Sequence, residues 1–416
     1  MNVVIINKSD STGGAAVVSL RLLNALRRQG VKAEMLVTEK NTDNPHVHLA
    51  ASRLRIKRSF LSERLKIYMK HGVNRSNLFK IDTGSRGLPL YRHPLVKKAD
   101  VICLNWVNQG VLSLRGVRKL LKIGKPVVWT MHDMWCFTGI CHHAGNCHNF
   151  ESDCGYCPLL GKSRSAHDLS YKTLRRKQKI YRRAGRRLHF VAVSNWLTAL
   201  ARKSTLLGEM PLSVIPNAFP MPSEVSRGRG DRFTLLFGAA RLDDPIKGLP
   251  ILIEATRKLK EKYPKEAERL ELVTFGNIRR PEALDGLAVS HRHLGRIDGE
   301  QNVRLLYQQA DAVVSTSLYE TLPGTLVEGQ AYGCVPVAFN RGGQPDIIDH
   351  LHTGYLAAWS DDPAEAASNI AEGIVWAMNQ EKETTRKHML DSVASKFDES
   401  VIADRYIELF KSLLDA

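Results

Sequence analysis

Two glutamates in the C-terminal half of the sequence have the chemistry and the spacing of a ligand site. Glu320 and Glu328 are separated by seven residues, which include Pro323 and Gly324. The apolar run 312–317 before them predicts a buried strand, and a helical pattern follows. Glu320 is therefore expected in the loop at the strand's C-terminal end, and Glu328 about two turns into the helix. Ligands bind at this end of the strands in open α/β sheets, so both carboxylates can reach one site.

Two cations follow an earlier strand of the same half. Arg241 and Lys247 lie in the loop between the apolar run 234–238 and the next helical pattern. Cations beside a helix N-terminus suit a pyrophosphate that departs with negative charge, although solvated surface charge is an alternative. Gly342 and Gly343 form a later turn.

The N-terminal half offers a glycine pair and a histidine at the ends of predicted strands. Gly13 and Gly14 follow the strand 2–6 and precede a helix, so their N–H groups can approach a phosphate at the helix N-terminus. A plain turn is the alternative, because the pair is not the Gly-x-Gly-x-x-Gly dinucleotide fingerprint. His132 follows the strand 126–131, where an imidazole can meet a substrate hydroxyl or a developing charge, and a purely structural histidine is the alternative.

Five of the seven cysteines lie in the segment 136–160, expected as an insertion in the first domain, and four of them fall within 17 residues. These four are Cys141, Cys147, Cys154 and Cys157. Reduced thiols in such a cluster favour metal over disulfides. Four thiolates would form a closed structural zinc site, which would hold the loop together and perform no catalysis. Free thiols or a redox pair are the alternatives.

The net charge of +18 is divided unevenly along the chain. Residues 1–230 carry 39 Lys and Arg against 13 Asp and Glu, whereas residues 231–416 carry 21 against 29. This division indicates one basic surface that faces a polyanion. Segments 51–70 and 162–187 are basic and suit an anionic membrane surface, unless they pack on their own domain with solvated charges. One helical face of the first segment is expected to carry Leu54, Phe60, Leu61, Leu65 and Tyr68.

The strands that hold these residues alternate with helical patterns in both halves, which predicts an α/β fold with doubly wound sheets. The first domain is expected over 1–217, a linker over 218–231 and the second domain over 232–398. A helix over 399–416 is expected to cross back to the first domain. Apolar runs are too short for a membrane span and no basic leader opens the chain, so a cytoplasmic protein is expected.

Several of these motifs together resemble one family. Glu320 and Glu328, with Pro323 and Gly324 between them, resemble the Glu-x7-Glu signature of retaining GT-B glycosyltransferases of family 4. The resemblance covers most of the chain and is strongest over 234–356. Further motifs that resemble the family are the opening Gly13-Gly14-Ala15, the Arg-Leu and Lys-Gly pairs at Arg241 and Lys247, and Thr130-x-His132-Asp133.

The cysteine segment narrows the resemblance to one branch, and one residue departs from the family. Trp135, Thr138 and Gly139 before the cysteines form a pattern similar to the colanic-acid and exopolysaccharide branch. Gly329 stands where the family commonly has Ala after the second glutamate. A glycine inside a helix weakens it by up to about 1 kcal/mol but leaves the Glu328 carboxylate where it was.

The resemblance implies two Rossmann-like domains that face across a cleft, and a hexosyltransferase that moves a sugar from a UDP- or GDP-sugar to a glycan with retention. It implies catalytic roles for His132, Glu320, Arg241 and Lys247. It implies donor binding by Gly13, Gly14, Arg241, Lys247, Glu320, Glu328, Gly342 and Gly343. The sequence contains no Asp-x-Asp, so no catalytic metal is expected. The expected acceptor is a polyprenyl-diphosphate-linked oligosaccharide in exopolysaccharide, capsule or O-antigen biosynthesis, at the inner face of the cytoplasmic membrane.

Two other functions fit part of the sequence. The net charge of +18 and the four cysteines also suit a nucleic-acid-binding zinc protein. The acidic second half and the Glu320–Glu328 pair argue against it, as does the absence of a recognised nucleic-acid-binding module. A nucleotide-sugar hydrolase or phosphorylase would keep the fold and change the chemistry.

Overall fold

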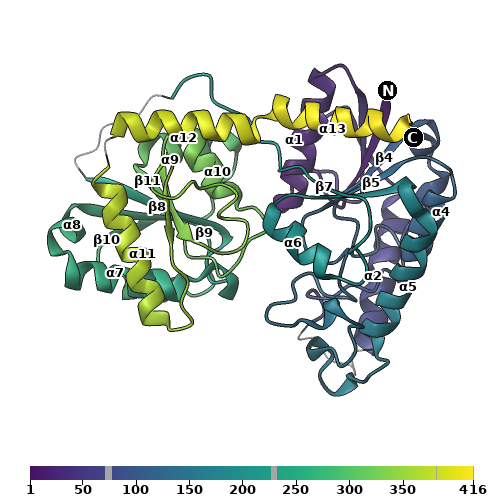
Figure 1. Cartoon of the computed structure of the whole chain (residues 1–416), viewed down its shortest axis with the longest axis horizontal. Coiled ribbons are helices and arrows are strands. Elements are labelled where there is room, and N and C mark those ends of the chain that lie inside the picture. Colours follow the sequence, from purple (N-terminus) through teal and green to yellow (C-terminus); the bar gives the residue numbers. More distant parts are fainter. Residues whose placement is uncertain (71–76, 226–231, 381, 416) are drawn as a thin grey trace. The chain divides into compact units, whose positions relative to one another are not determined.

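The computed structural model describes residues 1–70, 77–225, 232–380 and 382–415. The chain divides into two compact units (Figure 1). Unit 1 comprises Met1–Ala218 and Glu399–Ala416, and unit 2 comprises Phe219–Asp398. The division falls between Ala218 and Phe219, at the start of the predicted linker 218–231, of which residues 226–231 lie outside the described residues.

Unit 1 is built on a parallel sheet with the strand order β3-β2-β1-β4-β5-β6-β7. The central strands are almost wholly buried, which explains their continuous apolar runs. The strands are β1 (Asn2–Ile6), β2 (Lys32–Val37), β3 (Val47–Leu49), β4 (Val101–Leu104), β5 (Val127–Met131), β6 (Leu188–Ala192) and β7 (Leu212–Val214).

Helices connect these strands, and the last helix of the chain belongs to the same unit. Ile402, Tyr406 and Phe410 of α13 pack into a cluster with Leu22 and Leu26 of α1, so α13 completes the core of unit 1. The helices are α1 (Gly14–Arg28), α2 (Arg53–Lys70), α3 (Pro94–Lys98), α4 (Leu114–Leu121), α5 (Leu169–Ala184), α6 (Asn195–Lys203) and α13 (Glu399–Leu414).

Unit 2 repeats the design with the strand order β10-β9-β8-β11-β12-β13, again parallel. The register of β8 shifts between Gly238 and Arg241, at the strand's C-terminal end. The strands are β8 (Phe233–Arg241), β9 (Leu270–Asn277), β10 (Ser290–His293), β11 (Ala312–Ser315), β12 (Val335–Phe339) and β13 (Tyr355–Ala357).

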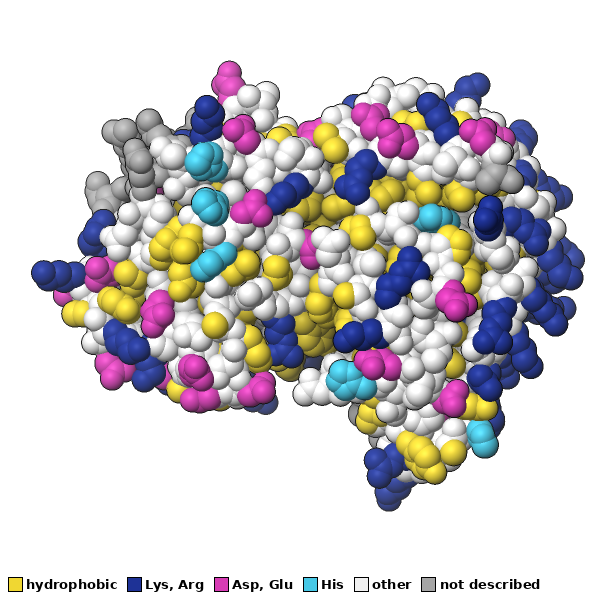
Figure 2. Space-filling model, in the orientation of Figure 1, with side chains coloured by type: hydrophobic (Ala, Val, Ile, Leu, Met, Phe, Trp, Pro, Cys, Tyr) yellow, Lys and Arg dark blue, Asp and Glu magenta, His cyan; other side chains and the backbone are white. Residues whose placement is uncertain are grey.

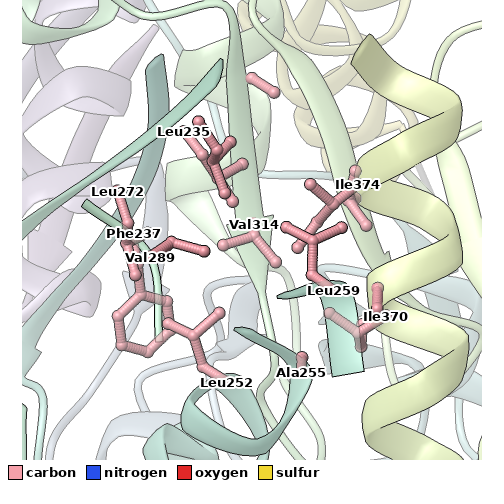
Figure 3. Packing of buried hydrophobic residues seen from close by; sticks show 14 of the residues in the cluster. Leu235, Phe237, Leu252, Ala255, Leu259, Leu272, Val289, Val314, Ile370 and Ile374 are labelled. Carbon is pink, nitrogen blue, oxygen red and sulfur yellow. The ribbon is translucent and has the colours of Figure 1, made fainter. Parts of the chain in front are cut away.

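The core of unit 2 lies between its sheet and two of its helices. Figure 3 shows Leu235, Phe237 and Val314 of the sheet facing Leu252 of α7 and Ile370 of α11. The helices are α7 (Leu249–Lys262), α8 (Pro264–Arg269), α9 (Glu300–Gln309), α10 (Gly324–Ala331), α11 (Pro363–Met378) and α12 (Lys382–Phe397).

Two parallel, doubly wound sheets confirm the predicted α/β class. One detail of the prediction was wrong. Because α10 begins at Gly324, Glu328 lies roughly one turn into the helix instead of two. Among the described residues, no helix is both long and apolar enough to cross a membrane.

Candidate functional site

The loops that follow β8 and β11 are fastened to each other by backbone contacts. The Thr316 hydroxyl donates to the carbonyl oxygens of Lys247 and Gly248, at 3.0 Å each. Gly248 opens α7 with a φ of 68°, and a Cβ there would lie 2.0 Å from the Thr316 carbonyl oxygen. Only glycine meets both demands, so the sequence pair Lys-Gly fixes the position of Lys247.

Lys247 and Glu320 form an ion pair across the two fastened loops. The Lys247 ammonium contacts Glu320 Oε1, and the Ser317 hydroxyl donates to the same oxygen at 3.0 Å. The side chains are 30% and 20% exposed, so both remain accessible from solvent. The structure thus joins two predicted site residues that lie 73 positions apart.

The glycine turn after β12 supports Glu320 from behind. Gly343 N–H donates to the Glu320 carbonyl at 2.7 Å. A Cβ on Gly343 would lie 2.0 Å from the Thr321 carbonyl oxygen, and one on Gly342 would lie 2.8 Å from the Glu320 nitrogen. These two glycines therefore have a structural task, which is to admit the backbone around Glu320.

Glu328 lies on α10 and accepts a hydrogen bond from the Tyr307 hydroxyl at 3.3 Å. Tyr307 is buried and its ring is parallel to that of Tyr332, with centroids 6.0 Å apart. The next residue, Gly329, packs so closely on β11 that a Cβ would lie 2.6 Å from Val313 Cγ1. The departure from the family's Ala therefore has a packing cause.

Arg241 ends β8, beyond the register shift of that strand. Its Nε lies 3.1 Å from Asp243 Oδ1, and its side chain is 40% exposed. Arg241 and Lys247 therefore flank one short loop, each beside a carboxylate, and both can turn toward an anion.

In unit 1, the glycine pair opens α1 as predicted from the sequence. Gly13 has a φ of 90°, which favours glycine, and a Cβ on Gly13 or Gly14 would meet nothing within 4 Å. Ser9 Oγ accepts from Thr12 N–H at 3.1 Å and so holds the turn before the helix. The open space above the pair leaves room for a ligand at this end of α1.

His132 follows β5 and is held by a residue that the sequence did not single out. Its Nε2 lies 2.8 Å from Asn105 Oδ1, an acceptor, so Nε2–H donates and this tautomer is fixed. Burial lowers the pKa of His132 to about 4 against the opposing effect of Asp133, so the imidazole is neutral at pH 7. Asn105 N–H donates to the Ile6 carbonyl, which places His132 at the sheet edge where β1 ends.

Asp133, next to His132, is a fully paired carboxylate. It accepts from Trp106 Nε1 at 2.8 Å, from Trp135 N–H at 2.8 Å and from His142 Nδ1 at 2.7 Å. Burial opposes ionisation of this group, but its interactions with His142, with His143 and with the Trp135 N–H prevail and lower the pKa of Asp133 to about 2. The carboxylate therefore anchors the loop that carries His132 to the cysteine segment.

The four predicted zinc ligands are free thiols in one irregular segment of unit 1. Burial raises the pKa of Cys141 to about 12 and that of Cys154 to about 11. The pKa of Cys157 is raised as well, again by burial. Across the described residues, no group of three or more His, Cys, Asp or Glu side chains is arranged to hold a metal ion. Zinc binding therefore stays a prediction.

Sequence reasoning missed the residues that orient the predicted ones. They are Asn105, Tyr307, Thr316 and Ser317. Three of the four stand just after β4 or β11, at the carboxyl end of a strand. Because ligands bind at that end of the strands, this position could have identified them from the sequence. Tyr307 lies inside α9 and gave no such signal.

Comparison with known families identifies the chain. Residues 12–220 match the family described as Glycosyltransferase Family 4, which is half of the chain. The chain belongs to glycosyltransferase family 4. Residues 232–374 match the description Glycosyl transferases group 1, so the two matches together span both units.

The names of curated relatives agree with this family. The colanic acid biosynthesis relative WcaC of Escherichia coli is 23% identical over 359 residues, 84% of this chain and 85% of WcaC. The phosphatidyl-myo-inositol mannosyltransferase of Mycobacterium tuberculosis is 25% identical over 48% of this chain, which spans about half of that relative's length (53%).

Two solved structures show the same fold. The pneumococcal O-GlcNAc transferase GtfA, in complex with UDP and GlcNAc, has a TM-score of 0.65 at 12% identity, covering 100% of this chain and 99% of GtfA. Anabaena Alr3699/HepE, in complex with UDP and glucose, has a TM-score of 0.61 at 17% identity, covering 99% and 100%. The fold is GT-B, with one Rossmann-like sheet in each unit.

Proposed function

We propose that the protein is a retaining glycosyltransferase that moves a sugar from a nucleotide-sugar donor to a glycan acceptor. The observation that carries this proposal is the Lys247–Glu320 pair, fixed between the loops after β8 and β11. Such a pair presents a cation to a departing diphosphate and an oriented carboxylate to the sugar beside it. Family membership supports the proposal, as do the UDP complexes of GtfA and HepE.

Each site residue receives one role. Arg241 and Lys247 offset the charge of the leaving nucleoside diphosphate. Glu328 accepts hydrogen bonds from the ribose hydroxyls. Glu320 contacts the donor sugar. Gly342 and Gly343 hold the Glu320 loop and border the donor.

The family resemblance assigns residues of unit 1 to donor binding as well. The N–H groups at Gly13 and Gly14 approach the diphosphate, where their open surroundings leave room. His132 meets the sugar as a neutral imidazole, since burial lowers its pKa to about 4. A neutral ring exchanges hydrogen bonds with hydroxyl groups without adding charge beside the developing oxocarbenium.

The chemistry we propose is front-face transfer. The bond between the anomeric carbon and the diphosphate oxygen breaks, and the acceptor oxygen bonds to the same face of that carbon. The acceptor proton passes to the leaving diphosphate, whose added charge Arg241 and Lys247 stabilise. No catalytic metal enters this scheme.

Thermal-shift measurements with nucleoside diphosphates and nucleotide-sugars test the donor site. One nucleotide is expected to raise the melting temperature of wild type and of Lys260→Ala, an exposed-lysine control on α7, but not that of Lys247→Ala. At 100 times the dissociation constant the stabilisation is about 2.7 kcal/mol. No response to any nucleotide by folded wild-type protein would overturn the proposal.

Product analysis separates transfer from hydrolysis on the same fold. With donor and acceptor present, NMR of the product is expected to show the anomeric configuration of the donor retained. Release of free sugar at the same rate with and without acceptor would identify a hydrolase instead.

We propose further that unit 1 docks on an anionic membrane through α2 and α5, where a lipid-linked oligosaccharide is the acceptor. Leu54, Leu61, Leu65 and Met69 of α2 are 58%, 51%, 61% and 63% exposed and lie on one helical face. Phe60 and Tyr68, predicted on this face, are half-buried. Figure 2 shows Lys and Arg side chains gathered where Figure 1 places α4 and α5. The exposed cations of α5 are Lys172, Arg175, Arg176, Lys179, Arg182 and Arg183.

Vesicle sedimentation tests this docking surface. Wild-type protein is expected to sediment with phosphatidylglycerol vesicles at low salt, and Leu61→Ser/Leu65→Ser to sediment less. Leu351→Ser, an exposed leucine of unit 2, serves as the control. Equal recovery of all three proteins in the supernatant would remove the membrane claim.

Structural zinc in the cysteine segment is the last part of the proposal. Cys141, Cys147, Cys154 and Cys157 fit zinc by the chemistry of four sulfur donors in one short segment. Zinc would release their protons and brace the loop that follows Asp133. Metal analysis of purified protein is expected to find one zinc per chain, lost in Cys154→Ser/Cys157→Ser. Less than a tenth of an equivalent in metal-replete preparations would count against it.

A further inference from the structure

A pocket of about 230 Å³ opens in unit 1 between the turn after β1 and the N-terminal half of α2. Lys8, Arg53 and Lys57 line it, together with the apolar side chains of Ile56 and Phe60. Among the described residues that line it, Glu39 is the one carboxylate, so cations outnumber anions there by three to one. This charge balance and this concave shape suit an anion bonded to an apolar chain.

Two polar groups and two aromatic rings surround the ammonium group of Lys8. Nζ donates to Gln109 Oε1 at 2.6 Å and lies 3.2 Å from Glu39 Oε1. The same nitrogen lies 5.6 Å from the centre of the Phe60 ring and 5.8 Å from that of Trp106. A cation held this firmly loses little conformational entropy when a ligand binds.

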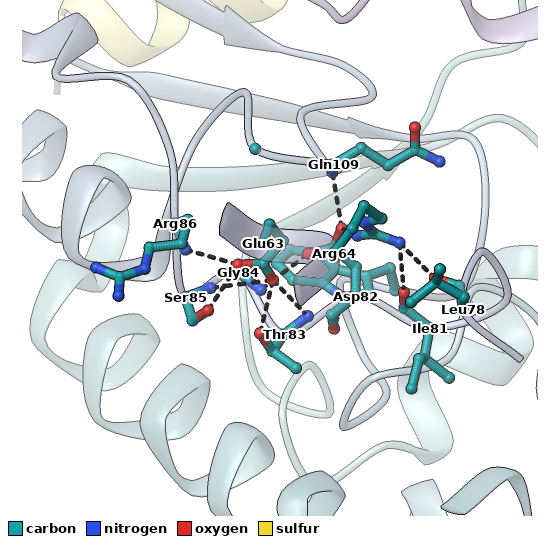
Figure 4. Close-up of polar contacts among 12 residues, drawn as sticks. Glu63, Arg64, Leu78, Ile81, Asp82, Thr83, Gly84, Ser85, Arg86 and Gln109 are labelled. Atoms are coloured by element: carbon teal, nitrogen blue, oxygen red, sulfur yellow. Dashed lines mark hydrogen bonds and ion pairs between the residues drawn. The ribbon is translucent and has the colours of Figure 1, made fainter. Parts of the chain in front are cut away.

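Gln109, the pocket residue that accepts from Lys8, is held by buried charged side chains behind it. Gln109 has a φ of 55°, which is rare for a residue other than glycine. Its N–H donates to Asp82 Oδ2 at 2.7 Å, and Arg64 Nη2 reaches the same oxygen at 2.6 Å (Figure 4). Asp82 and Arg64 are both buried, so this chain of contacts fixes the strained Gln109 beside Lys8.

Close packing of α2 completes the pocket. A Cβ on Gly110 would lie 2.8 Å from the Phe60 nitrogen, and Ser59 Oγ donates to the Gly110 carbonyl at 2.6 Å. Glu63, on the next turn, accepts from Thr83 Oγ1 and Ser85 Oγ at 2.6 Å each (Figure 4). The helix that carries Arg53 and Lys57 is therefore anchored by its polar side, which leaves its leucines exposed.

We propose that this pocket binds the phosphate or diphosphate group of the acceptor, with Arg53, Lys57 and Lys8 as the recognising cations. The proposal deepens the transferase function and rests on it. The pocket lies beside the turn that leads to Gly13, and the exposed leucine face belongs to the same helix. One helix can thus rest on a lipid surface and hold the charged head group of an acceptor anchored there.

Calorimetry on the full-length protein tests the pocket with three probes: inorganic pyrophosphate, farnesyl diphosphate and farnesol. The variant Arg53→Gln/Lys57→Gln removes two lining cations. The matched control, Arg55→Gln/Lys66→Gln, removes the same charge from α2 positions outside the pocket. The pocket variant is expected to weaken binding of both diphosphates by about tenfold or more, and the control by less than about twofold.

The probes identify the source of the anion. Tighter binding of farnesyl diphosphate than of pyrophosphate indicates a lipid-linked acceptor, and equal binding indicates recognition of the head group alone. If both double variants weaken diphosphate binding equally, the proposal is overturned, because the effect would then come only from the overall positive charge of α2. The proposal is also overturned if diphosphate affinity depends on Lys247 and not on the pocket residues. It is likewise overturned if farnesol binds as tightly as farnesyl diphosphate.

Nucleotide thermal shifts on the same variants keep the two proposals separable. A nucleotide response in Arg53→Gln/Lys57→Gln with unchanged diphosphate affinity refutes the pocket and leaves the transferase intact. If the folded wild-type protein responds to no nucleotide, the transferase proposal is refuted instead.

Discussion

The two units share one architecture but differ in the contacts that hold the loops of their sites. In unit 2, glycines admit backbone against backbone, as Gly248 does at Thr316 and Gly343 at Thr321. In unit 1, buried charged side chains do the equivalent work, with Arg64 and Asp82 fixing the turn at Gln109. Backbone packing fixes loops without adding charge, whereas buried ion pairs hold only while both partners remain.

The comparison also concerns charge. Residues 1–230 hold a large excess of cations, and residues 231–416 a small excess of anions. The cations of unit 2 that the proposal uses, Arg241 and Lys247, each lie beside a carboxylate. The exposed cations of α5 instead form a continuous surface. The same sheet architecture therefore supports a local anion site in unit 2 and a broad basic surface in unit 1.

Breaking the buried ion pair of unit 1 is expected to have the largest effect. Arg64→Met leaves the Asp82 carboxylate buried without its cation, which costs about 3–5 kcal/mol in the free energy of unfolding. The double variant Arg64→Met/Asp82→Leu is expected to recover part of that loss. Urea denaturation measures both. Equal stability of wild type and the single variant would show that side-chain charge does not hold this turn.

Removing charge at the site of unit 2 is expected to affect catalysis more than stability. Glu320→Gln keeps the shape of the side chain and its contact with Ser317 but loses the negative charge that faces Lys247. We expect kcat to fall by about a hundredfold, with a small change in donor KM. Glu261→Gln on α7, an exposed control, is expected to leave both constants unchanged. A rise in KM with kcat unchanged would instead assign Glu320 to ground-state binding.

The depressed pKa of His132 gives unit 1 a specific pH dependence. The folded protein keeps this group neutral down to about pH 4, whereas the unfolded chain takes up a proton near pH 6.5. The stability that His132 contributes is present above pH 6.5 and is lost as the pH falls toward 4, by roughly 3 kcal/mol at most. His132→Gln is expected to flatten the fall in melting temperature over this range, and His167→Gln, at an exposed position, to leave it unchanged. Parallel pH profiles for wild type and His132→Gln would contradict the burial argument.

The smallest effect is expected at Gly329. Helix propensity alone favours Gly329→Ala by about 1 kcal/mol. The added Cβ would lie 2.6 Å from Val313, so overpacking is expected to outweigh that gain and leave a net loss of about 1–2 kcal/mol. Gly329→Ala/Val313→Ala frees the space and tests the cause. A single variant more stable than wild type would show that α10 can shift away from β11.

Much of the fold followed from patterns that are local in the sequence. The strand predicted over 2–6 is β1 (Asn2–Ile6), and the one predicted over 126–131 is β5 (Val127–Met131), because apolar period and turn residues act over a few positions. The strand expected over 312–317 ends earlier, at Ser315. The residues after it turn away to bond with the Lys247 loop, and that contact comes from 68 positions away.

The candidate site, too, was predicted only in part from the sequence. Strand-end position and motif resemblance singled out Glu320, Lys247 and His132, and the structure supplied the groups that orient them. Thr316 and Asn105 make their contacts only because parallel strands bring their carboxyl ends to one sheet edge. The outward face of α2 shows the same limit, since helical period gives a leucine stripe but does not say which side is buried.

The sequence by itself determined the alternation of strands and helices, the glycine turns and the division of charge, because these depend on neighbouring residues and on composition. Only the tertiary structure decided that Lys247 meets Glu320, that Asn105 fixes His132 and that Arg64 holds the turn beside Lys8. These contacts join positions that lie far apart in the chain. Their free energy comes from packing and desolvation, which exist only when the chain is folded.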